Sequence, residues 1–191
     1  MNPLTEKDLW PLPVYERVRD EFRREVIAAK QHRRVALGPV MTLIFENRLT
    51  VKFQIQEILR TERISSPEGI AEELVGFNDL VPGPGELSAT LMIELRGAEE
   101  AVAAELQRLT GFSRHLRLEL GPRRIPARFE EGRDDGRRIS AVQYLRFPVG
   151  DAARALADLA QPAALVADHP SYSHRAALSD DVRRSLAADL A

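Results

Sequence analysis

The sequence has no cysteine among its 191 residues. Disulfide bonds, thiolate metal ligands, an iron–sulfur cluster held by the chain's own side chains and a cysteine nucleophile are therefore excluded. An excess of one charge is also missing, because 27 Lys and Arg stand against 29 Asp and Glu, for a net charge of −2. We therefore expect no nucleic-acid partner bound through bulk positive charge.

Long apolar runs are missing as well. No stretch approaches the roughly 18 to 20 apolar residues that a membrane-spanning helix needs. The first fifteen residues carry Glu6, Lys7 and Asp8 among three prolines, without the basic start and apolar centre of a secretory signal. We therefore expect a cytoplasmic protein with no membrane partner.

What the chain does contain is a globular composition, with 44% hydrophobic and 29% charged residues. No stretch rich in Pro, Gly and Ser divides it, and no internal repeat is visible. The sequence therefore predicts a single domain over residues 1–191, with a C-terminal arm from about residue 168 that packs on the body or on a partner.

Helices are predicted from apolar spacing and from capping residues. Apolar residues recur at three- and four-residue intervals from Val14 to about His32. Thr50 is a candidate cap for a second helix, and Ser66 followed by Pro67 is a typical start for a third. Further helices are expected over Glu99–Leu109, from the cap Asp151 to about Ala160, and over Asp180–Leu190 after the cap Ser179.

Strands are predicted from alternation, which is clearest over Leu87–Leu95. Shorter strands are expected over Met41–Phe45, Leu116–Leu120 and, at a sheet edge, Ala164–Ala167. The segments Ile125–Phe129 and Ile139–Phe147 flank a polar loop and read as a hairpin. The order of elements predicts an α+β fold, with a mainly antiparallel sheet of about five or six strands covered by helices.

Carboxylates and a buried amide are the candidate chemical groups. Glu46 follows an apolar strand, Glu57 lies on the next helix, and Glu94 lies on the polar face of the clearest strand. Converging carboxylates can ligate a metal or act as acid and base, and the alternative is that they pair with arginines at the surface. Gln143 shares a strand face with apolar residues, where it lines a pocket or satisfies a loop carbonyl.

A second candidate is the segment HPSYSH with the aspartate before it. Imidazole and carboxylate groups bind divalent metals, so Asp168, His169 and His174 form an alternative metal site. The spacing differs from that of a helical zinc motif, and Pro170 favours a loop. The alternative is that His169 and Tyr172 anchor the end of the chain by packing and hydrogen bonds.

Several stretches together resemble a bacterial family of unknown function, DUF 3501: RVALGP, TLIFENRLTVKFQIQEILRTERI, NDLVPGPGELSATLMIEL, SAVQYLRF and the segment around DHPSY. The likeness covers almost the whole chain in order. It implies a cytoplasmic accessory role beside rubrerythrin-like or iron–sulfur redox proteins. Its motifs place polar residues inside apolar blocks and suggest one polar pocket, formed by Glu46, Asn47, Gln54, Glu57, Arg60, Glu94 and Gln143.

Two hypotheses from different classes follow. The first is an accessory or interaction protein of a redox or oxidative-stress system, with no cofactor of its own. The second is a small-molecule or metal-binding enzyme that uses the polar pocket, with catalytic residues unknown. A homodimer through a sheet edge or through the last helix is plausible under either hypothesis.

Overall fold

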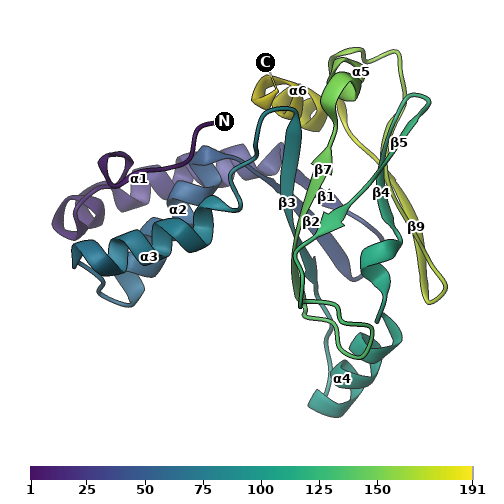
Figure 1. Ribbon diagram of the computed structural model, residues 1–191, viewed down its shortest axis with the longest axis horizontal. Coiled ribbons are helices and arrows are strands. Elements are labelled where there is room, and N and C mark those ends of the chain that lie inside the picture. The colour runs from purple at the N-terminus through teal and green to yellow at the C-terminus, as the bar shows by residue number, and fades with distance from the viewer. Residues whose placement is uncertain (191) are drawn as a thin grey trace.

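A computed structural model describes residues 1–190 and shows a lobe of three helices standing beside two packed sheets (Figure 1). The lobe contains α1 (Leu12–Gln31), α2 (Arg48–Thr61) and α3 (Pro67–Asn78), with the short helix η1 (Glu6–Asp8) before them. The helices of the lobe pack around two small apolar clusters, one around Val51, Ile55 and Leu59 and one around Tyr15 and Phe22.

The first sheet, sheet A, has five antiparallel strands in the order β1-β2-β3-β7-β6. Their bounds are Arg34–Ala36 for β1, Met41–Glu46 for β2, Glu86–Ile93 for β3, Val142–Pro148 for β7 and Arg128–Phe129 for β6. In the centre of the sheet Leu91 stands opposite Leu43 on one side and Gln143 on the other.

The second sheet, sheet B, has four antiparallel strands in the order β5-β4-β8-β9. Their bounds are Arg123–Pro126 for β5, Leu116–Leu120 for β4, Ala163–His169 for β8 and Tyr172–Ala177 for β9. Phe45 and Phe147 of sheet A share one apolar cluster with Leu118 and Leu165 of sheet B, and all four are fully buried. The main core therefore lies between the two sheets.

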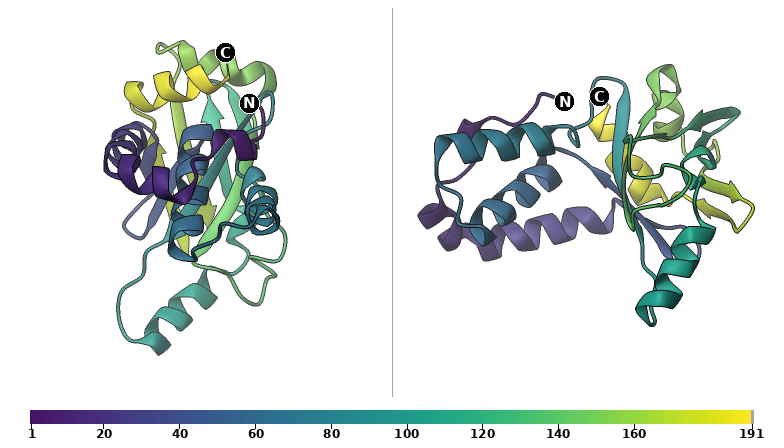
Figure 2. Two further views of the ribbon diagram at one scale, coloured as in Figure 1. Left: turned by 90° about the vertical axis from the view of Figure 1, so that its left-hand side faces the viewer. Right: turned by 60° about the horizontal axis from the view of Figure 1, so that its bottom comes forward.

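Short helices lie near the ends of the sheets (Figure 2). Their bounds are Glu99–Arg108 for α4, Phe112–Arg114 for η2, Gly150–Ala153 for η3, Arg154–Ala157 for α5 and Asp180–Asp189 for α6. In both views α4 projects from one end of the molecule, while α5 and α6 lie together near the opposite end. In the described part of the chain, no helix combines the length and the apolar character that a membrane crossing requires.

The α+β class and the mainly antiparallel pairing are confirmed, and the strands divide into two sheets. The predicted caps Ser66 and Ser179 each accept a backbone N–H in the first turn of α3 and α6. The segment from about residue 168 forms the end of β8, all of β9 and α6, and Val182 and Leu186 join the main core. In this structure α6 therefore packs on the rest of the chain.

Four local predictions were wrong. The second helix is capped by Asn47, three residues before Thr50, because the Asn47 side chain accepts the Thr50 N–H and the Thr50 hydroxyl accepts the Asn47 N–H. The helix predicted after Asp151 is one 3₁₀ turn followed by one α turn. The strand around 164–167 is central, between β4 and β9.

The fourth correction concerns the predicted hairpin of Ile125–Phe129 with Ile139–Phe147. The first of these segments is divided between the two sheets, since β5 pairs with β4 and only β6 pairs with β7. Gly121 and Pro122 supply the turn that folds β5 back onto β4. Alternation identified the strands, but it carries no information on which partner each strand chooses.

Candidate functional site

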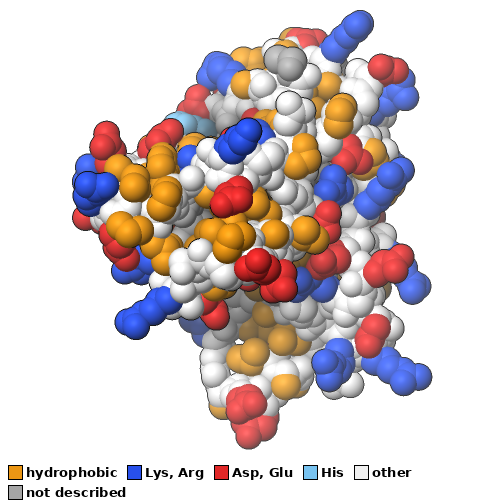
Figure 3. All heavy atoms as spheres, turned by 60° about the vertical axis from the view of Figure 1, so that its left-hand side comes forward, with side chains coloured by type: hydrophobic (Ala, Val, Ile, Leu, Met, Phe, Trp, Pro, Cys, Tyr) orange, Lys and Arg blue, Asp and Glu red, His pale blue; other side chains and the backbone are white. Residues whose placement is uncertain are grey.

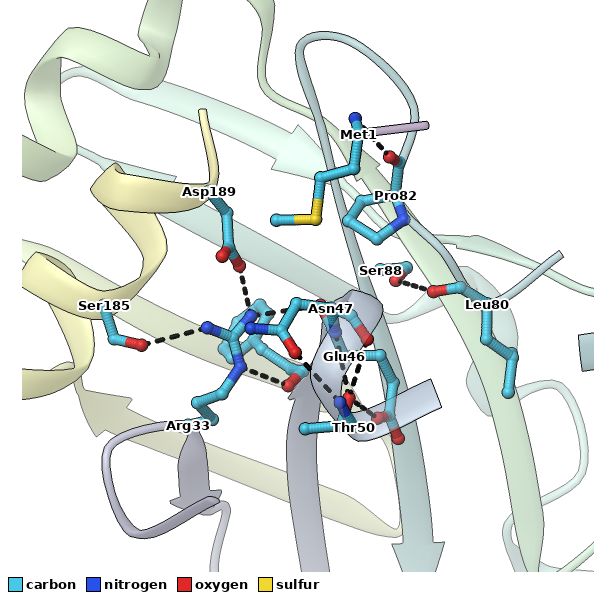
Figure 4. Close-up of polar contacts among 11 residues, drawn as sticks. Met1, Arg33, Glu46, Asn47, Thr50, Leu80, Pro82, Ser88, Ser185 and Asp189 are labelled. Carbon is cyan, nitrogen blue, oxygen red and sulfur yellow. Dashed lines mark hydrogen bonds and ion pairs between the residues drawn. The ribbon is translucent and has the colours of Figure 1, made fainter. Parts of the chain in front are cut away.

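Glu46 lies at the end of β2 and is 3% exposed. Its carboxylate accepts hydrogen bonds from two hydroxyls, one from Thr50 on α2 and one from Thr90 on β3, the latter at 2.7 Å. Figure 4 shows the carboxylate turned toward Thr50 at the junction of β2 and α2. These contacts fix the entry into α2 and occupy the carboxylate inside the fold.

Asn47 and Gln54 also serve α2 itself. The Asn47 side-chain oxygen accepts the Thr50 N–H at 3.1 Å, which satisfies one of the free donors of the first turn. The Gln54 side-chain amide lies 3.5 Å from the Thr50 carbonyl, within one turn of the same helix. Both groups therefore interact locally.

Glu57 joins α2 to α1. Its carboxylate accepts two hydrogen bonds from the Arg19 guanidinium, at 2.8 and 2.7 Å, and a third from the Tyr15 hydroxyl at 2.8 Å. The Arg19 hydrogen bonds are the largest cause of a lowered Glu57 pKa, and burial raises the pKa of the Tyr15 hydroxyl. Glu57 therefore joins the two helices through a bidentate, charge-assisted pair of hydrogen bonds with Arg19.

We expect the Glu57→Gln variant to lower the free energy of unfolding at neutral pH by about 1–2 kcal/mol, because Arg19 loses its anion. Since folding depresses the Glu57 pKa, its contribution is present above the unfolded pKa and is lost as pH falls through the folded pKa. Urea unfolding at several pH values should therefore show the variant and the native chain converging in acid. A difference between them that stays constant down to pH 3 would contradict this account.

Arg60 and Glu94 are held elsewhere. The Arg60 Nε lies 2.9 Å from a carboxylate oxygen of Glu16 on α1. Glu94 follows β3 and accepts the Thr42 hydroxyl. Thr42 and Glu46 are four residues apart on β2, which places their Cα atoms about 13 Å apart along the strand. The structure therefore does not bring Glu94 to the group formed around Glu46 and α2.

Gln143 is fully buried on the inner face of β7. Its side-chain amide donates to the carbonyls of Arg133 and Ser140, at 3.1 and 2.8 Å, and so secures the loop between β6 and β7. Its side-chain oxygen is buried and has no hydrogen-bond partner among the described residues. The contacts match the expectation that this amide satisfies loop carbonyls.

Replacing Gln143 with leucine is expected to cost about 1–3 kcal/mol, because two loop carbonyls lose their donor. The loop should also be cut faster by a protease, since its backbone would open more often. Limited proteolysis read by mass spectrometry locates the cut. Equal cleavage rates in the variant and the native chain would show that other contacts secure the loop.

The alternative metal ligands lie on both faces of sheet B. Asp168 points outward and pairs with Arg117 and with His115, the latter at 3.2 Å. His169 points inward, with one ring nitrogen 3.2 Å from the Thr110 carbonyl and the other accepting the Ser171 N–H. His174 packs against the Tyr172 ring. Among residues 1–190 no group of three or more His, Asp or Glu is placed to hold a metal.

Two buried arginines were not singled out from the sequence. Arg33 follows α1 and is 2% exposed. It donates to the carbonyls of Phe45 and Glu46, at 2.8 and 3.0 Å, and it binds Ser185 and Asp189 of α6 (Figure 4). Arginine is usually exposed, and in a chain with many arginines nothing local marks this one.

Arg183 on α6 is 4% exposed. It donates to five backbone carbonyls at the end of α5 and in the loop that follows: Ala155, Leu156, Asp158, Leu159 and Gln161. A cation is favoured at a helix C-terminus, where carbonyls lack intrahelical partners. Together, Arg33 and Arg183 attach α6 to two separate parts of the protein.

Two of the surface hollows border the helical lobe. The first, the lobe pocket, has a volume of about 330 Å³ and lies where η1 and the start of α1 meet α2 and α3. It is lined by Glu6, Leu9, Trp10, Pro11, Leu12, Pro13, Leu59, Ile64, Ser65 and Ile70. The second, the α3 groove, has a volume of about 660 Å³ and lies between α3 and the outer face of β6 and β7. Figure 3 shows apolar side chains gathered over the lobe, and a hollow beneath it.

Comparisons with known proteins agree with this architecture. The family model described as "Protein of unknown function (DUF3501)" matches residues 3–190. A crystal structure of a novel protein of unknown function from Burkholderia pseudomallei K96243 is 35% identical, with a TM-score of 0.92 and full coverage of both chains. No curated protein matches the chain.

Proposed function

This chain belongs to the DUF3501 family, and we propose that it is an accessory protein that acts by binding a protein partner. The observation that carries the proposal is the lobe pocket. Its lining is mainly apolar, and it opens to solvent at the part of the lobe built from η1 and the start of α1.

The lobe pocket has the chemistry of a protein-binding site. Trp10 stands edge-on to Phe22, with ring centroids 4.9 Å apart, and the Lys52 ammonium lies 3.4 Å from the centre of the Trp10 ring. The aromatic wall is therefore held in place before any partner arrives. Exposed apolar hollows of this kind receive an apolar anchor side chain from a partner.

The family resemblance supplies the class of partner, which is an iron–sulfur or rubrerythrin-type redox protein. In this proposal the chain brings no cofactor, works in the cytoplasm, and contributes recognition alone. A homodimer through a sheet edge or through α6 also remains a proposal, and light scattering at increasing concentration tests it. The edge strands are β1 and β6 in sheet A and β5 and β9 in sheet B.

Partner capture with a pocket variant tests the proposal. Ser65 lines the lobe pocket, is exposed, and its side chain has no hydrogen bond among the described residues. Ser65→Arg would fill the mouth of the pocket without removing any core contact. Ser173→Arg is the matched control, because Ser173 is also an exposed serine but lies on β9 of sheet B, outside the lobe pocket. Both tagged variants and the native chain are incubated with cytoplasmic extract, and captured proteins are identified by mass spectrometry.

We expect the native chain and Ser173→Arg to retain the same redox protein and Ser65→Arg to lose it. Capture that is equal for all three chains would remove the lobe pocket from the proposal. Capture of no redox protein in repeated experiments would remove its partner class.

The alternative function, an enzyme that uses the predicted polar pocket, has no observation in its favour. Glu46, Glu57 and Glu94 each accept hydrogen bonds from side chains of neighbouring elements, and Arg60 lies against Glu16. Groups engaged in this way hold the fold together, and a substrate would have to displace those partners.

A further inference from the structure

The α3 groove has two walls of opposite charge over an apolar floor. One wall, the helix wall, contains Glu72 and Glu73 of α3 and Asp79 after it. The opposite wall, the sheet wall, contains Arg128 and Arg146 of the outer face of sheet A and Arg133 of the loop. Aromatic and aliphatic side chains, among them Phe77 and Tyr144, lie between the walls.

The sheet wall has one unsatisfied cation. Arg128 of β6 stands directly opposite Arg146 of β7, and like charges in that position destabilise a strand pair. Arg146 is compensated by Glu86, at 2.9 Å. Arg128 has no carboxylate within 4 Å and no side-chain hydrogen bond among residues 1–190. The guanidinium of Arg128 is therefore available to an anion.

A flat surface lies next to this cation. The Arg133 guanidinium lies over the Tyr144 ring, 4.2 Å from its centre, and it is ion-paired with Glu130. Stacking fixes the Arg133 plane, and its charge is already balanced. The sheet wall therefore offers one free positive charge beside a rigid, largely apolar platform.

The helix wall has an excess of negative charge. The sequence of α3 contains three glutamates and no lysine or arginine. Glu72, Glu73 and Asp79 make no ion pair within the described chain, so no ion pair joins the two walls. Gly76 of α3 also lines the groove, and a Cβ atom added there would meet no atom within 4 Å.

We propose that the α3 groove binds a small dipolar molecule, with its carboxylate or phosphate on Arg128 and its ammonium group toward Glu72 and Glu73. A molecule of this kind completes the pairing that each wall lacks, and its chain lies over Tyr144 and Phe77. The volume of about 660 Å³ is within the range of small-molecule sites. This site goes beyond the proposed accessory function, because it is separate from the lobe pocket.

Nuclear magnetic resonance titration of the full chain tests the site. The dipolar probes are 4-aminobutanoate, which carries a carboxylate, and 2-aminoethyl phosphate, which carries a phosphate. Butanoate and butylammonium are the single-charge controls. We expect at least one dipolar probe to produce saturable shifts at groove residues and to bind about threefold to fivefold more tightly than either single-charge probe, because one additional exposed ion pair is worth up to about 1 kcal/mol. The probe that binds more tightly identifies the anionic group.

Variants assign the two walls. Arg128→Gln and Glu73→Gln should each weaken binding of the dipolar probe about threefold to fivefold, and Arg123→Gln, which changes an exposed arginine of β5, should leave its affinity unchanged. Gly76→Phe should abolish binding by filling the space between the walls. Melting temperatures confirm that each variant is folded.

Three results would overturn the proposal: affinities of butanoate and 4-aminobutanoate that are equal, an effect of Arg123→Gln as large as that of Arg128→Gln, or no saturable shift up to about 20 mM of either dipolar probe. None of them bears on partner capture at Ser65, which tests the accessory function independently.

Discussion

The Asp189→Ala variant is expected to lose about 3–5 kcal/mol of unfolding free energy, which is the cost of leaving a buried charge without its counterion. Asp189 is the carboxylate partner of Arg33, and their side chains are 8% and 2% exposed. After the substitution the guanidinium would keep Ser185 and two carbonyls as acceptors but would have no anion. Urea or guanidinium unfolding measures the loss.

Two further variants show whether burial is the reason. Arg184 lies on the same helix and pairs with Asp181 at the surface, so Arg184→Ala should cost less than about 1 kcal/mol. The double variant Arg33→Met with Asp189→Leu removes both charges and should regain part of the stability, because no charge is then buried alone. If Asp189→Ala were no more costly than Arg184→Ala, the buried ion pair would not hold α6.

The Arg183→Ala variant is expected to cost about 3 kcal/mol, because several carbonyls at the end of α5 lose their only cationic donor in a buried place. No carboxylate lies within ion-pairing distance of Arg183 in the described residues, so carbonyl dipoles alone balance its charge. The loss of stability should be greatest around α5 and the loop that follows it. Hydrogen exchange should accelerate over residues 155–161 before it accelerates in β4 or β8.

Arg183→Lys separates charge from geometry. A lysine ammonium is a single point of donation, whereas the guanidinium donates from three nitrogens in a fixed plane. We therefore expect lysine to recover less than half of the lost stability. Full recovery with lysine would mean that the charge, rather than the five directed contacts, holds the end of α5.

Local sequence patterns predicted several elements correctly. Ser66 and Ser179 cap their helices, and the alternation over Leu87–Leu95 gives β3. Pairing was predicted poorly, because which strands meet depends on the whole chain. Residues 125–129 are the clearest case, since one apolar segment serves two sheets.

The candidate site shows the same division. Polar residues within apolar blocks were correctly identified as unusual, and Glu46 and Gln143 are indeed buried. Glu46 and Glu57 also bind partners far away in the sequence, since Thr90 is 44 residues from Glu46 and Arg19 is 38 residues from Glu57. The α3 groove was missed for a related reason. Its walls come from α3 and from β6 and β7, and neither wall has a motif of its own.

The contact between Arg33 and Asp189 also sets an order of events during synthesis. The two residues are 156 positions apart. At roughly 5–20 residues per second, the ribosome makes Asp189 on the order of 8–30 s after Arg33. During that interval the guanidinium has no counterion and must remain in water. The junction between α1 and β2 therefore closes only late, after the lobe and sheet A have already emerged.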